Sequence, residues 1–142
     1  MHMKDTKIKI LKETNNFFLF DLRELERCIK LIVDYFGLDK GVEIKLTNDR
    51  EIERLNSEFL NIQAPTNVLS FPAEEEDFLG SICVSVDTIM REAFLYDQDI
   101  KEYFLRMLIH GMLHLMGYEH GDEMFEYTDI LLEHLKENHC IV

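Results

Sequence analysis

The chain has 142 residues, of which 46% are hydrophobic and 30% charged. This balance is typical of a globular protein that folds as one domain over residues 1–142, and it excludes the disordered and fibrous classes. The formal net charge of -13 argues against tight nonspecific binding of nucleic acid, because such binding depends on Lys and Arg at the phosphates. A local basic cleft, or docking on a larger partner, stays compatible with this charge.

Neither a membrane segment nor a disulfide framework is expected. No apolar run reaches the roughly 18 residues of a membrane span, and the N-terminal segment with Lys4 and Asp5 lacks the apolar core of a signal peptide. Cys28, Cys83 and Cys140 are odd in number and show no C-x-x-C spacing, so we expect free thiols, the first two in the core. These features predict a cytoplasmic protein without membrane contact.

The first predicted elements alternate between strand and helix. A strand at 7–12 precedes a helix with Asp21 as its N-cap, and a strand at 42–47 precedes a helix with Asn48 as its N-cap. Three apolar residues of this second helix share one face: Ile52, Leu55 and Phe59.

The later elements are a predicted hairpin and three helices. The hairpin strands are expected at 67–72 and 79–86. The helices are expected at 87–96, 99–116 and 122–137, the last with Asp122 as its N-cap. This order predicts an α+β fold, in which about five helices cover a small mixed four-stranded sheet.

The stretch HGMLHLMGYEH, residues 110–120, places three histidines within eleven residues. At about 100° of rotation per residue, His110 and His114 point the same way from one helix, and Gly117 would end that helix and let His120 return towards them. The same helical stripe carries Tyr103 and Met107. Three histidine nitrogens are the ligand set of many catalytic Zn²⁺ sites, so the spacing predicts a metal site on this helix and the following loop.

Two other interpretations of the histidines stay open at this point. They are also consistent with ordinary core or surface residues, and their spacing resembles the H-E-x-x-H-x-x-G-x-x-H helix of metzincin proteases. In this chain Gly111 stands where such a protease has its glutamate, so peptide hydrolysis would lack its proton acceptor. The spacing does not select one metal, since histidine also binds Ni²⁺, Co²⁺ and Fe²⁺.

Two sequence blocks extend this pattern beyond the histidines. HGMLHLMGYEH resembles H-G-x-L-H-L-x-G-Y-D-H, with Glu119 at the usual Asp, and LNSEFLNIQAPTNVLSFP resembles L-N-x-x-Y-R-x-x-D-x-P-T-D-V-L-S-F-P. Both motifs are similar to those of the YbeY family of rRNA maturation endoribonucleases, and together they cover essentially the whole domain. The resemblance implies an α+β fold and one metal ion, usually zinc, with His110, His114 and His120 as ligands.

The resemblance also implies an activity and partners. The expected activity is a single-strand-selective endoribonuclease that acts in 16S rRNA 3′-end maturation and ribosome quality control. The expected partners are rRNA and the small ribosomal subunit, with a small-subunit ribosomal protein and an Era-type GTPase as further candidates. Four positions depart from the family pattern: Leu60 in place of an arginine thought to support catalysis, Gln63 and Asn67 in place of aspartates, and Ser81 in place of an acid.

Charged candidates for catalysis are few. Arg54 and Arg91 are the cations that we would expect opposite the metal, with solvated helix charges as the alternative interpretation. Glu119 precedes the third histidine and would orient a ligand or hold a water molecule, which makes it a catalytic candidate together with His114. A surface acid is the alternative for Glu119.

Polar residues at the start of the third predicted strand are candidates for substrate binding: Thr66, Asn67 and Ser70. Turn chemistry and backbone hydrogen bonds explain these side chains equally well. Three functions therefore remain in view. The first is a metal-dependent endoribonuclease, the second a ribosome-assembly factor with a mainly structural metal, and the third a metal-dependent hydrolase of another substrate.

Overall fold

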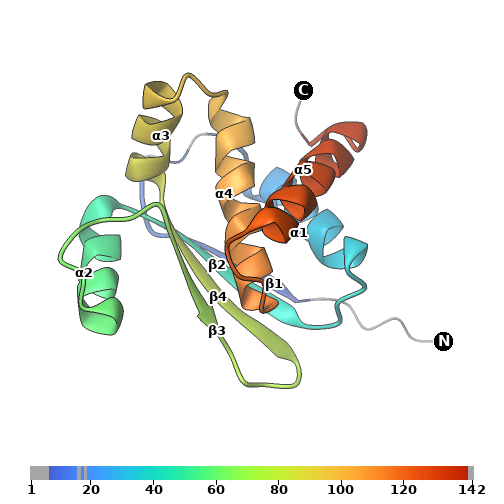
Figure 1. The fold of residues 1–142 in the computed structure, drawn as a ribbon, viewed down its shortest axis with the longest axis horizontal. Coiled ribbons are helices and arrows are strands. Elements are labelled where there is room, and N and C mark those ends of the chain that lie inside the picture. Colours follow the sequence, from blue (N-terminus) through green and yellow to red (C-terminus); the bar gives the residue numbers. More distant parts are fainter. Residues whose placement is uncertain (1–6, 16, 18, 141–142) are drawn as a thin grey trace.

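The computed structural model describes residues 7–15, 17 and 19–140, so the N-terminal expectation built on Lys4 and Asp5 lies outside it (Figure 1). The described residues form a four-stranded mixed sheet with five helices, which confirms the expected α+β class. The elements are β1 (Ile8–Lys12), α1 (Leu22–Tyr35), β2 (Gly41–Thr47), α2 (Asp49–Leu60), β3 (Val68–Pro72), β4 (Phe78–Ser85), α3 (Val86–Leu95), α4 (Ile100–Leu115) and α5 (Asp122–Glu137). No helix formed by these residues is long and apolar enough to cross a bilayer.

The sheet has the strand order β1-β2-β4-β3. β1, β2 and β4 run parallel, whereas β3 returns antiparallel to β4 with Val68 opposite Val84, which confirms the predicted hairpin. β3 is therefore an edge strand, and the functional cavity described below opens beside it.

The two faces of the sheet carry different helices, and Figure 1 shows α2 standing apart from α4 and α5. Ile82 and Val84 face the main core, which α1, α4 and α5 complete, whereas Cys83 faces a small cluster under α2. This alternation follows from the two-residue period of a strand. Each fully buried aliphatic side chain contributes about 1.5–3 kcal/mol, so the larger cluster dominates stability.

The apolar face expected for α2 is present, but its far end is open to solvent. Ile52 and Leu55 are buried, and Phe59 is 58% exposed. It lies one turn beyond Leu55, and its ring packs on the partly buried ring of Phe71 with centroids 5.4 Å apart. Periodicity therefore placed Phe59 on the correct face.

The helix starts follow the predicted caps with one exception. Asp21 and Asn48 accept hydrogen bonds from the backbone N–H groups three residues later, at 2.8 and 2.9 Å. Asp122 is not an N-cap, because Gly121 occupies that position and offers no side chain. Asp122 is instead the first residue of α5, where its negative charge interacts favourably with the positive end of the helix dipole.

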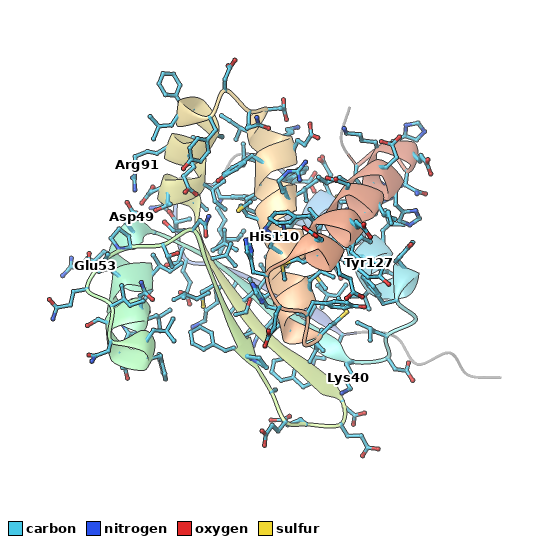
Figure 2. The ribbon with its side chains drawn as sticks, in the orientation of Figure 1. Lys40, Asp49, Glu53, Arg91, His110 and Tyr127 are labelled. Atoms are coloured by element: carbon cyan, nitrogen blue, oxygen red, sulfur yellow. The ribbon has the colours of Figure 1, made fainter. Side chains whose placement is uncertain are left out.

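The Asp49 carboxylate joins the N-termini of α2 and α3, and the Asp49 N–H also donates to Asp87 at 3.2 Å. Asp49 accepts hydrogen bonds from the hydroxyls of Ser85 and Thr88, both at 2.6 Å, and pairs with Arg91 at 2.6 Å (Figure 2). Burial raises the pKa of Asp49, but the hydrogen bonds from Ser85, Thr88 and Arg91 together outweigh it and hold the pKa below the usual 3.8. The ionised form is therefore the one that holds these helices together.

Replacing Asp49 with Asn should lower the free energy of unfolding at neutral pH by about 1–2 kcal/mol, because hydrogen bonds to a charged group are lost. A depressed pKa in the folded state stabilises the protein above the unfolded-state pKa, and this contribution disappears as the pH falls through the folded value. The difference in the free energy of unfolding between wild type and Asp49→Asn, measured by urea unfolding, should therefore become smaller below about pH 4. Asp97→Asn, at an exposed residue with positive φ that Asn tolerates, is the control. An unchanged difference at acid pH would contradict the role of the carboxylate.

Candidate active site

A cavity of about 630 Å³ opens between α3, α4 and β3. One wall is the predicted stripe of α4, which supplies Tyr103, Met107, His110 and His114. His120 joins them from the loop before α5, so the cavity brings together all three predicted ligand histidines. Figure 2 shows His110 on α4 next to the start of α5.

His110 has the properties of a neutral ligand. Its Nε2 atom is buried and has no hydrogen-bond partner among the described residues. Burial, together with the nearby Arg106, His120 and His114, lowers the pKa of His110 to about 4. At neutral pH the ring is therefore uncharged and carries a nitrogen lone pair.

His114 is oriented by the end of its own helix. Gly117, with φ of +94°, donates its N–H to the carbonyl of His114, and Tyr118 donates to Leu113, each at 3.0 Å. This is the hydrogen-bond pattern of a Schellman C-cap, as the position of Gly117 predicted. The turn places the Tyr118 carbonyl 3.1 Å from Nδ1 of His114. Since a carbonyl only accepts, Nδ1 carries a proton, and in the neutral ring Nε2 is the nitrogen with the lone pair.

His120 is exposed on the loop, and its ring lies edge-on to Phe125 with centroids 5.0 Å apart. The His110 ring contacts the same phenyl group at 6.0 Å. Across residues 7–15, 17 and 19–140, no group of three or more His, Cys, Asp or Glu side chains has the spacing that holds a metal ion. The donor types and the neutral ring of His110 fit a transition metal, whereas the three rings do not form a coordination cage in this structure.

The cavity also contains a carboxylate that the sequence did not reveal. Glu92 of α3 is half-buried, and its Oε1 atom accepts hydrogen bonds from Asn67 Nδ2 at 2.9 Å and from the Tyr103 hydroxyl at 3.1 Å. A weak signal existed, because Glu92 borders the buried stripe of Ile89 and Ala93. The packing of α3 on α4 was needed to show which cavity it faces.

Two of the predicted substrate residues line the cavity. Asn67 reaches Glu92 and also accepts a hydrogen bond from the N–H of Val68 at 2.7 Å. Ser70 donates its hydroxyl to the Gly111 carbonyl at 3.0 Å, which ties β3 to α4. Thr66 lies just before β3 and is not part of the cavity lining.

The charged candidates lie elsewhere. Arg54 pairs with Glu51 and Glu58 at 2.6 and 2.8 Å on the outer side of α2. Arg91 pairs with Asp49, as described above, and neither arginine lines the cavity. Glu119 is exposed and also absent from its lining. The structure therefore does not bring these three side chains to the histidines.

Two of the four departures noted in the sequence, Leu60 and Asn67, lie in the cavity wall, and Gln63 and Ser81 do not. Leu60, where the YbeY pattern has arginine, lines the cavity and is 56% exposed. Among the described residues, no Lys or Arg lines this cavity. Ser81 lies on the other face of the sheet, beside Phe59 and Phe71.

Comparison with known proteins agrees with the fold and the motifs. The family model described as endoribonuclease YbeY matches residues 4–136. An endoribonuclease YbeY of Lawsonia intracellularis is 45% identical over 97 residues, covering 68% of this chain and 73% of that protein. One of Alteromonas mediterranea is 41% identical over 106 residues, covering 70% and 67%. The solution structure of TM1509 from Thermotoga maritima matches with a TM-score of 0.70 at 32% identity, covering 94% of both chains. The chain therefore belongs to the endoribonuclease YbeY family.

Proposed function

We propose that this protein is a single-strand-selective, metal-dependent endoribonuclease that acts in 16S rRNA 3′-end maturation and ribosome quality control. The observation that carries the proposal is the cavity wall of α4 and its loop, where His110, His114 and His120 gather. The names of the curated relatives support the endoribonuclease activity over the other two candidate functions.

The proposed cofactor is one Zn²⁺ ion, with Ni²⁺ as an alternative, held by the three histidines. When bound, such an ion supplies Lewis acidity towards a phosphoryl oxygen and lowers the pKa of water to about 7. The chain itself contributes a neutral imidazole at His110, whose pKa burial lowers to about 4. At His114 the Tyr118 carbonyl accepts from Nδ1, which leaves Nε2 as the nitrogen for a metal ion.

The proposed partners are rRNA and the small ribosomal subunit, with a small-subunit ribosomal protein and an Era-type GTPase, in the cytoplasm. Two surface properties support docking on a larger assembly. The net charge of -13 favours a basic protein partner, and α3 exposes Phe94 and Leu95 by 84% and 72%.

The cavity also favours one alternative in part. A cavity to which the described residues supply no Lys or Arg is unusual for a phosphodiesterase, and this supports a ribosome-assembly factor with a mainly structural metal as the second candidate. The two functions are compatible in one protein. A peptide hydrolase is disfavoured, because Gly111 is buried against the sheet and supplies no proton acceptor.

Replacing Leu60 with Arg should accelerate cleavage of a single-stranded rRNA fragment by roughly tenfold, because a cation at the cavity rim stabilises charge on the phosphate. The measurement is the initial rate with metal-analysed protein at equal folded concentration. Ile62→Arg, which adds the same charge at an exposed residue outside the cavity, is the matched control and should leave the rate near that of wild type. A wild type that fails to cleave any single-stranded RNA would contradict the proposed nuclease activity.

A further inference from the structure

Glu92 is the one acidic side chain among the described residues that line the histidine cavity. Its position is fixed from two sides, by Asn67 Nδ2 and by the Tyr103 hydroxyl, which both donate to Oε1. Burial and the neighbouring Glu92 raise the pKa of Tyr103 to about 12, so the tyrosine remains a donor at neutral pH. The second oxygen, Oε2, makes no hydrogen bond with the described residues and stays available as an acceptor.

A carboxylate in this place does not bind phosphate, because like charges repel and none of the described lining residues is a Lys or Arg that would offset the repulsion. A nucleotide can approach Glu92 only through a hydrogen-bond donor, either a ribose hydroxyl or a base N–H group. One free oxygen suits a group with a single donor, such as the 2′-hydroxyl. The Watson–Crick edge of guanine would engage both oxygens of a carboxylate.

Tyr96 provides a second contact at the same end of the cavity. Tyr96 is the C-cap residue of α3 and follows Glu92 by four residues, so both side chains lie on the same side of this helix. Its ring lines the cavity, is 59% exposed and packs edge-on to Tyr103 with centroids 6.2 Å apart. Exposed aromatic rings are platforms on which the bases of single-stranded nucleic acid stack.

The distance between Glu92 and the histidines limits the role of this carboxylate. Tyr103, which holds Glu92, precedes His110 by seven residues, or about 10.5 Å along the axis of α4. A sugar bound at Glu92 would therefore belong to a nucleotide next to the one at the histidines. Hydrolysis by water does not use the 2′-hydroxyl, so selection of RNA over DNA requires a separate contact that detects this group.

We propose that Glu92 and Tyr96 form a nucleoside subsite, in which Oε2 of Glu92 accepts a hydrogen bond from a ribose 2′-hydroxyl while the base stacks on Tyr96. This inference rests on the proposed endoribonuclease function and adds a residue that distinguishes RNA from DNA. Asn67 and Tyr103 act as positioning residues that aim the carboxylate.

The test compares wild type, Glu92→Gln and Glu53→Gln on one single-stranded RNA that carries a single 2′-deoxynucleotide at each position around the cleaved bond in turn. Glu53 is an exposed residue of α2 outside the cavity, so Glu53→Gln removes the same charge without changing the cavity (Figure 2). In wild type and Glu53→Gln, one position should slow cleavage roughly tenfold or more when its hydroxyl is removed, as expected for a charged hydrogen bond. In Glu92→Gln the same removal should slow cleavage less than about threefold, since a neutral acceptor binds more weakly. Equal sensitivity in wild type and Glu92→Gln would overturn the proposal.

A binding measurement separates failure of this inference from failure of the nuclease proposal. Fluorescence anisotropy with RNA and DNA oligonucleotides of the same sequence, in the presence of chelator, measures binding without cleavage.

Wild type should bind the RNA more tightly than the DNA. Both Glu92→Gln and Tyr103→Phe should reduce this preference, and thermal unfolding checks that the two variants are folded. Equal binding of RNA and DNA by wild type would overturn the subsite even if cleavage occurs. A preference for RNA by a wild type that does not cleave would support the subsite and contradict only the nuclease.

Discussion

Replacing His114 with Ala is expected to reduce RNA cleavage at least about a hundredfold while the protein stays folded. The ring is exposed, and within the described part of the chain its one hydrogen bond is to the Tyr118 carbonyl, so its loss costs about 0.5–1.5 kcal/mol of stability. The measurements are the cleavage rate, the bound metal per chain after dialysis, and the thermal unfolding midpoint.

His139→Asn is a suitable control for this loss. His139 is an exposed histidine outside the cavity, and Asn tolerates its backbone φ of 62°. The control should retain wild-type activity and metal content. Full cleavage by His114→Ala with metal still bound would contradict the assignment of the histidine wall as the active site.

Replacing Gly111 with Glu should destabilise the protein by on the order of 3–5 kcal/mol, because an unpaired carboxylate would be placed between α4 and the sheet. A Cβ atom at this position would already lie 3.0 Å from Val68 Cγ1 and 3.1 Å from Ile82 Cγ2. The substitution restores the glutamate of the metzincin motif, yet we expect loss of structure and no peptidase activity. Urea unfolding followed by circular dichroism measures the effect.

Two matched variants separate size from charge in this experiment. Gly111→Gln has the same bulk without the charge and should be less destabilised than Gly111→Glu. Gly111→Ala should change stability by only about 1 kcal/mol, since the gain in helix propensity offsets the tight contact. A stable Gly111→Glu variant would show that α4 does not lie as close to β3 and β4 as described.

The parts of the site that the sequence predicted are those set by local geometry. Helical rotation placed Tyr103, Met107, His110 and His114 on one wall, and these four residues do line the cavity. Gly117 ended α4 as predicted, because a left-handed backbone at the helix end is a local property of glycine. The strands and the hairpin were predictable for the same reason, since alternation and turn residues determine them.

The parts that were not predicted depend on contacts between distant segments. Arg91 was a substrate candidate, but its charge is paired with Asp49 from a different helix. Glu92 received no role, because only the packing of α3 against α4 brings it to Tyr103. Asp122 was assigned a cap because acids often occupy that position, but Gly121 already provides the extended residue before the helix.

The position of β3 at the sheet edge has a consequence for self-association. Asn67 and Ala73 make their backbone hydrogen bonds to β4, so by alternation the N–H and C=O groups of residues 68, 70 and 72 point away from the sheet. The Val68 N–H is occupied by the Asn67 side chain, and Pro72 has no N–H to offer. Ser70 alone among these three retains a free backbone donor. An incoming strand from another molecule would find three carbonyl acceptors but only one N–H donor, so this edge disfavours strand addition although it stays open beside the cavity.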